Sequence, residues 1–163
     1  MTMTPAPTPS APATATASAT ASASADAGVD AAQAALAGEH ACVYGYGVVG
    51  AHLPDGAEPA HTALAAHRSR RDELAALIAG TGADPVAAEP GYALPSPVTD
   101  EASARALAVL LEERLGALYA DVVGAATTPE LREFAVRGVV MSAVQALSWG
   151  GSPVAFPGLD GRV

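Results

Sequence analysis

Four ionisable side chains fall inside or beside stripes of apolar residues in this chain of 163 residues, and their types can do metal or ion-pair chemistry. Glu39 and Glu112 supply carboxylates, His67 an imidazole and Arg71 a guanidinium. Carboxylates combined with imidazoles are the usual iron and manganese ligands of helical bundles. A guanidinium beside the same carboxylates forms an ion pair instead. The residue types therefore predict either a metal site or an internal ion-pair cluster.

Proline, glycine and capping residues indicate which elements carry these side chains. Asp30, the group Thr99, Asp100 and Glu101, and Thr128 followed by Pro129 have the character of helix starts. Gly-Gly-Ser-Pro at 150–153 ends the last apolar pattern. No strand is required anywhere. We expect four helices, over about residues 30–53, 60–80, 101–124 and 129–149.

The connections between these helices predict the topology. Residues 54–56 and 125–128 are short turns, which make the helices on either side antiparallel neighbours. Residues 81–98 hold four prolines and two glycines, which forbid a helix or a central strand there. Extended, such a crossover reaches roughly 60 Å and a 20-residue helix is roughly 30 Å long, so the third helix can begin at the far end. We predict an all-α four-helix bundle of two antiparallel hairpins joined by one long crossover.

Composition sets the expected domain limits and location. Residues 1–28 are almost entirely Ala, Thr, Ser and Pro, so we expect a disordered tail, then a bundle over 29–158 and a C-terminal tail over 159–163. No secretory signal or membrane span is evident, which favours the cytoplasm. Cys42 is the single cysteine and is expected to be a buried apolar residue.

The net charge of −9, with only eight basic residues, disfavours nucleic acid and anionic membranes as partners. Small residues in the first helix allow close packing of a neighbouring helix. Association into a homodimer through the first two helices is left open, since many small bundles associate. The identity of a small ligand or protein partner is not given by the composition.

Helical periodicity predicts which polar groups face the core. At 100° per residue, Glu39 lies centrally in the apolar stripe of its helix, and His67 and Arg71 lie within the next one. Arg71 is expected to neutralise Glu39, because an unpaired buried charge is costly. Two interpretations follow: a pocket kept for a ligand, or an ion-pair network that only fixes helix register. The expected polar core consists of Glu39, Tyr46, His67, Arg71, Glu112, Tyr119 and Gln145.

Several short motifs resemble one family. They are Gly-Glu-His-Ala at 38–41 with Tyr-Gly-Tyr-Gly-Val-Val-Gly at 44–50, His-Arg-x-x-Arg at 67–71, Tyr-Ala-Leu-Pro at 92–95 and Ala-Phe-Pro-Gly at 155–158. Together they resemble a bacterial branch of the ferritin-like superfamily that is labelled a domain of unknown function. The resemblance covers about residues 31–158 and implies the bundle fold. It implies no activity, because the branch has none assigned.

The match to a di-iron centre is poor. That centre takes one Glu from each of two helices and Glu-x-x-His from each of the other two. Leu64 stands where His67 needs its paired carboxylate, and the fourth helix has no histidine. With the first turn centred near Gly56, His67 is also expected roughly 7 Å along the axis from the level of Glu39. We therefore expect no metal cofactor; the alternative is iron or manganese on Glu39, His67 and Glu112.

The sequence thus leaves two classes of function open. The favoured class is a metal-free, non-enzymatic bundle that acts as a ligand-binding or protein-interaction module. The alternative is a metal-dependent oxidase or a metal-storage protein with an incomplete carboxylate and histidine site. No catalytic residue is assigned.

Overall fold

The computed structural model describes residues 14–53 and 57–159, with side chains described from residue 25 onward. Four α-helices and no strand are found in these ranges, which confirms the all-α prediction. The helices are α1 (Thr14–Ala51), α2 (Ala57–Gly80), α3 (Glu101–Ala125) and α4 (Pro129–Ser148).

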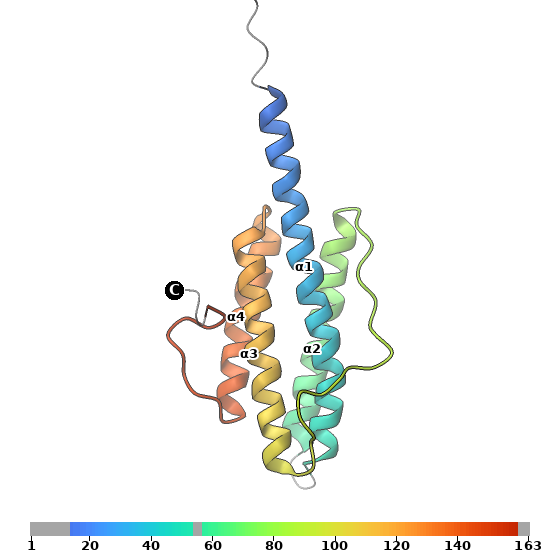
Figure 1. Cartoon of the computed structure of the whole chain (residues 1–163), viewed down its shortest axis with the longest axis vertical. Coiled ribbons are helices and arrows are strands. Elements are labelled where there is room, and N and C mark those ends of the chain that lie inside the picture. The colour runs from blue at the N-terminus through green and yellow to red at the C-terminus, as the bar shows by residue number, and fades with distance from the viewer. Residues whose placement is uncertain (1–13, 54–56, 160–163) are drawn as a thin grey trace, which may run out of the picture.

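The predicted connectivity is also confirmed. α1 and α2 form one antiparallel hairpin, and α3 and α4 form the other. Residues 81–100 connect the two hairpins and run the length of the bundle along its outside (Figure 1). The main helix contacts are α1 with α2, α1 with α3, and α3 with α4. Polar groups on α1, α2 and α3 are therefore brought together, whereas α4 packs mainly against α3.

The start of α1 differs from the prediction. α1 begins at Thr14 rather than near Asp30, and its first turns project beyond the other helices (Figure 1). Ala is the strongest helix former, and no proline follows Pro12 in this part of the chain. Extending an existing helix also avoids the cost of nucleation. Half of the expected tail is thus helical, and residues 1–13 and 160–163 lie outside the described residues.

Capping residues fix the second hairpin. Asp100, rather than Thr99, is the N-cap of α3. Its carboxylate accepts a 2.8 Å hydrogen bond from Ser103 N, and the hydroxyl oxygen of Ser103 accepts a hydrogen bond from Asp100 N. Thr128 caps α4 as predicted, with Pro129 in the first turn. These reciprocal bonds satisfy amide groups that would otherwise lack partners at a helix start.

The crossover is held against α1 by polar and aromatic contacts. Gln33 donates to the Asp84 carbonyl at 2.7 Å and accepts from Val86 N at 2.8 Å. The rings of Tyr44 and Tyr92 lie 5.5 Å apart. Leu94 and Val98 pack against the core from the same segment. The long connection is therefore ordered on the bundle surface despite its prolines.

Small residues permit close helix approach inside the bundle. Gly138 of α4 faces the ring of Tyr119, where a Cβ atom would lie 2.5 Å from Tyr119 Cδ2. This glycine makes room for an aromatic side chain whose hydroxyl reaches the polar core. Cys42 is buried, as predicted.

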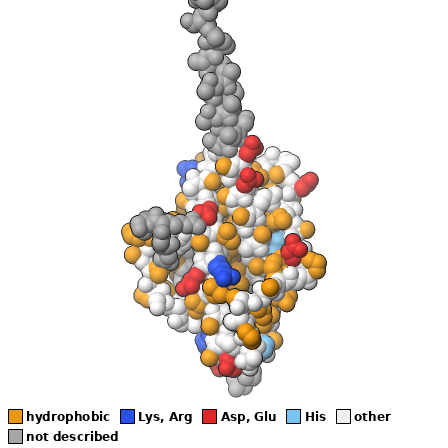
Figure 2. Space-filling model, viewed as in Figure 1, with side chains coloured by type: hydrophobic (Ala, Val, Ile, Leu, Met, Phe, Trp, Pro, Cys, Tyr) orange, Lys and Arg blue, Asp and Glu red, His pale blue; other side chains and the backbone are white. Residues whose placement is uncertain are grey.

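The outer surface has no marked basic character on the face shown in Figure 2. Basic side chains there are isolated among apolar and acidic ones rather than gathered into a patch (Figure 2). Of the helices described, none has the length and apolar character needed to cross a membrane.

Candidate functional site

Three ionisable side chains from three helices meet in the middle of the bundle. Glu39 of α1, His67 of α2 and Glu112 of α3 are each 0% exposed. His67 lies between the carboxylates: its Nδ1 is 2.8 Å from Glu39 Oε2 and its Nε2 is 3.0 Å from Glu112 Oε1. Both ring nitrogens are therefore engaged, one by each carboxylate.

Two buried tyrosines complete the ends of this cluster. Tyr119 donates its hydroxyl to Glu39 Oε1 at 2.5 Å, and Tyr46 donates to Glu112 Oε1 at 2.6 Å. The Tyr46 ring also packs against the imidazole of His67, with 4.8 Å between ring centroids. Five of the seven expected polar-core residues are thus brought together.

The expected pairing of Arg71 with Glu39 is wrong, because Arg70 takes that position. Arg70 Nε donates to Glu39 Oε1 at 3.0 Å, and its side chain is only 14% exposed. Arg70 Nη2 also lies 2.9 Å from His67 Nδ1, so the guanidinium and the imidazole share one carboxylate. Arg71 instead pairs with its neighbour Asp72 at 2.7 Å near the surface.

The predicted axial offset between Glu39 and His67 is also wrong. Both residues stand 14 positions from Leu53, so the hairpin is centred there rather than near Gly56. α1 ends at Ala51, before the expected end at residue 53, and α2 begins at Ala57, before the expected start near residue 60, so His67 lies at the level of Glu39. Gln145 is half-buried on α4, and its side chain makes no hydrogen bond within the described residues.

Burial and neighbouring charges act in opposite directions on this cluster. Burial alone lowers the pKa of His67, but the hydrogen bonds and negative charges of Glu112 and Glu39 outweigh it, so the pKa of His67 is raised. Burial alone raises the pKa of Glu39, but His67, Arg70 and Tyr119 together lower it. These neighbours thus raise the pKa of His67 and lower the pKa of Glu39.

The remaining groups keep their ordinary charge states. Burial lowers the pKa of Arg70, yet Glu39 more than compensates and raises it. Burial and an adjacent carboxylate raise the pKa of Tyr46 and of Tyr119, so both stay protonated donors. Arg70 and His67 are thus the basic neighbours of the buried carboxylates: His67 contacts both Glu39 and Glu112, and Arg70 contacts Glu39.

One part of the cluster is left unsatisfied. Glu112 Oε2 is buried and has no hydrogen-bond partner among the described residues, and the same holds for Ser142 Oγ on α4. Both residues line a cavity of about 160 Å³ between α3, α4 and the segment 152–158. Buried polar atoms without partners are uncommon and are usually satisfied by water or a ligand.

The donor set does not fit a metal centre built on Glu39, His67 and Glu112. Nδ1 and Nε2 point from opposite edges of one imidazole ring toward different carboxylates. A single ion can therefore reach one ring nitrogen and one of these carboxylates, but not all three residues. Across the described residues, no group of three or more His, Cys, Asp or Glu is arranged to hold a metal ion.

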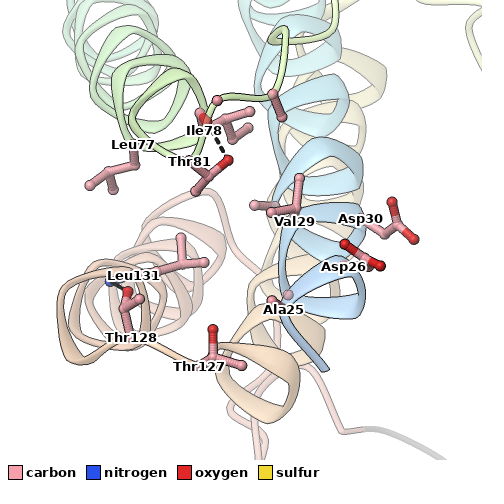
Figure 3. Close-up of a pocket in the computed structure, with 14 residues that line it drawn as sticks. Ala25, Asp26, Val29, Asp30, Leu77, Ile78, Thr81, Thr127, Thr128 and Leu131 are labelled. Atoms are coloured by element: carbon pink, nitrogen blue, oxygen red, sulfur yellow. Dashed lines mark hydrogen bonds between the residues drawn. The ribbon is translucent and has the colours of Figure 1, made fainter. Parts of the chain in front are cut away.

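A larger cavity of about 590 Å³ lies at the end of the bundle where α1 projects (Figure 3). Leu77, Ile78 and Leu131 form its apolar wall, whereas Asp26 and Asp30 lie on the side of α1 turned away from them (Figure 3). Thr81 donates to the Ile78 carbonyl, so that hydroxyl already has a partner. Size alone therefore does not make this cavity the better candidate site.

A four-helix bundle with a carboxylate, imidazole and guanidinium cluster is thus the class that fold and site define. The chain belongs to the family described as a domain of unknown function (DUF4439), whose model matches residues 31–161. It is similar to the crystal structure of a conserved hypothetical protein from Mycobacterium tuberculosis, at 38% identity and a TM-score of 0.74. That match covers 76% of this chain and 95% of the other. No curated protein matches the chain.

Sequence reasoning missed Arg70 and Ser142. Arg70 lies three positions after His67, a spacing that places both on neighbouring parts of one helix surface. Which flank of α2 faces α1 is not given by the periodicity of α2 alone. Ser142 falls between buried Gly138 and Ala146 on α4, and that i, i+4 spacing was the available signal.

Proposed function

We propose that this domain is a metal-free, non-enzymatic binding module of the ferritin-like kind, in which the cluster of Glu39, His67, Arg70 and Glu112 fixes helix register. The connectivity of two hairpins and one crossover supports the ferritin-like relationship. The single observation that carries the metal-free part is that basic side chains already contact the carboxylates: His67 contacts both, and Arg70 contacts Glu39. An ion bound here would have to displace one of these cations.

The binding role rests on the remaining oxygen of Glu112. Structural clusters are expected to be fully satisfied, because an unpaired buried polar atom is costly. Glu112 Oε2 departs from that expectation, and Glu112 and Ser142, which both carry such an oxygen, lie beside the cavity between α3, α4 and residues 152–158. We therefore assign the cavity between α3 and α4, rather than the cluster itself, as the binding site. A cytoplasmic location and partners other than nucleic acid belong to the same proposal and agree with the net charge of −9.

Metal analysis tests the metal-free part. The protein is purified from medium supplemented with iron, manganese and zinc, and its metal content and melting temperature are measured before and after chelation. We expect far less than one tightly held ion per chain and no change in melting temperature, since removal of a bound ion would destabilise the fold. One retained equivalent that is lost in His67→Gln, but kept in the control His61→Gln on the exposed side of α2, would contradict the proposal.

A further inference from the structure

The outer face of α4 differs from the other described helices because it exposes large apolar residues. Five of them are between 46% and 60% exposed: Val136, Val140, Met141, Val144 and Leu147. Within the described residues, α2 and α3 expose no large apolar residue, and α1 exposes only Tyr44, whose ring packs near Tyr92. α4 packs mainly against α3, so its outer face is left to solvent.

We propose that this face is the interface of a homodimer, in which the α4 helices of two copies pack antiparallel about a two-fold axis. Contiguous exposed apolar residues mark surfaces that bind another protein. The inference goes beyond the proposed function, because it concerns the outer face of α4 and holds whether or not the neighbouring cavity takes a ligand.

The spacing of the exposed residues fits a second copy of the same helix. Val136, Val140, Val144 and Leu147, here called the α4 stripe, follow one another at intervals of four, four and three residues, so they lie along one side of the helix. An antiparallel copy runs in the reverse order, which places Val136 opposite Leu147 and Val140 opposite Val144. Each member of the stripe therefore meets another member, which is the self-complementarity that a two-fold interface requires.

The distribution of charge along α4 favours the same arrangement. Its four charged residues all lie in its first half: Glu130, Arg132, Glu133 and Arg137. Residues 138–148 contain no charge, so two chains that each carry a net charge of −9 can approach there without facing carboxylates. In an antiparallel pair the charged half of one helix lies against the uncharged half of the other. A parallel pair would instead bring each charge beside its own copy, which is unfavourable.

The size of the α4 stripe predicts a reversible dimer. Val136 and Leu147 are roughly 17 Å apart along the helix axis. Five half-exposed apolar side chains over that length supply on the order of a few hundred Å² per copy. A standard stable interface buries about 800 Å² per partner, so the dimer is expected to dissociate at low micromolar concentration.

Sedimentation equilibrium of the full chain tests the dimer. We expect the mass to rise from that of one chain, 16.0 kDa, toward twice that value as the concentration increases through the micromolar range. A mass of one chain at every concentration up to the millimolar range would overturn the proposal.

A charge at the centre of the α4 stripe should prevent association. Val140→Glu places like charges close to the two-fold axis, so we expect the dissociation constant to rise at least roughly hundredfold. The residue is 56% exposed, so the melting temperature of the dilute protein should stay close to that of the parent. Val86→Glu, which adds the same charge at an exposed position outside α4, is the matched control and should dimerise as the parent does. Equal loss of dimer in both variants would assign the effect to net charge and would overturn the interface.

A mixing experiment tests the antiparallel order. Val140→Glu and Val144→Arg should each be monomeric alone, and an equimolar mixture should form a dimer of one chain of each, because positions 140 and 144 face each other across the axis. Failure of the mixture to associate, when the parent dimerises, would overturn the antiparallel pairing.

Discussion

The two buried carboxylates of this bundle have the same chemistry but unequal surroundings. Glu39 is satisfied at both oxygens: Oε1 accepts from Tyr119 and Arg70, and Oε2 contacts His67. Glu112 accepts from Tyr46 and contacts His67 through Oε1, and its Oε2 has no partner in the described structure. The half of the core around Glu39, here called the closed half, is therefore fully hydrogen-bonded, whereas the half around Glu112 keeps one oxygen without a partner in the described structure.

This difference separates stability from binding within one cluster. The guanidinium and the tyrosine that hydrogen-bond to the buried carboxylate of Glu39 fix how α1, α2 and α3 pack against one another. Leaving one oxygen of the second carboxylate unpaired costs stability unless another molecule fills the position. Breaking the ion pair of Glu39 with Arg70 should therefore destabilise the protein most, because it leaves a buried charge without its partner.

The largest expected effect comes from breaking the ion pair between Glu39 and Arg70. Glu39→Gln leaves two buried cations with too little negative charge, and Arg70→Met leaves Glu39 short of a cation. Each should lower the free energy of unfolding by on the order of 3 kcal/mol, and the double variant should cost less than the sum. Urea unfolding of the four proteins measures this coupling.

Arg71→Met is the matched control for that cycle. Arg71 is the next residue on α2, its side chain is 28% exposed, and its ion pair is with the exposed Asp72. Its replacement should change the free energy of unfolding by less than about 0.5 kcal/mol. If Arg71→Met cost as much as Arg70→Met, the closed half of the core would not be built as described.

The fold could be predicted because its signals are local. Pro129 after Thr128 and Asp100 before Ser103 mark helix starts within one turn, and the prolines of residues 81–98 exclude a helix without reference to any other segment. The start of α1 was mispredicted because an Asp at position 30 has the character of an N-cap, whereas continuation of an Ala-rich helix through it is equally allowed by sequence.

The site could be predicted only in part, because it depends on relations between helices. Periodicity places Glu39 and His67 in the core but leaves open which flank of α2 faces α1. That flank decides between Arg70 and Arg71. The cavity beside Glu112 depends on where the irregular segment 152–158 lies, and no periodic pattern gives that position.

A smaller effect is expected from the two tyrosines that end the cluster. Tyr119→Phe leaves Glu39 with Arg70 and His67, whereas Tyr46→Phe leaves Glu112 with His67 alone. A hydrogen bond to a charged group contributes about 1.5–3 kcal/mol, so we expect about 2 kcal/mol for Tyr46→Phe and about 1 kcal/mol for Tyr119→Phe. Urea unfolding measures both. The opposite order would mean that the Glu112 half is the better satisfied one.

The smallest expected effect is the dependence of stability on pH, since protonation removes no atom from the network. The pKa of Glu39 is lowered from 4.5 on folding, so its contribution is present above about pH 4.5 and is lost as the pH falls through the folded-state value. The pKa of His67 is raised from 6.5, so its contribution is present below about pH 6.5 and is lost as the pH rises through its folded-state value.

Stability should therefore be highest between about pH 4.5 and about pH 6.5, where both contributions are present. Urea midpoints measured across the pH range test this profile. His67→Gln should flatten the alkaline side, because the imidazolium that bridges the two carboxylates is gone. The exposed His61→Gln, on the same helix, should leave that side unchanged. An alkaline loss that persists in His67→Gln would assign the titration to another group, and the charge balance between Glu39 and Glu112 would then not depend on His67.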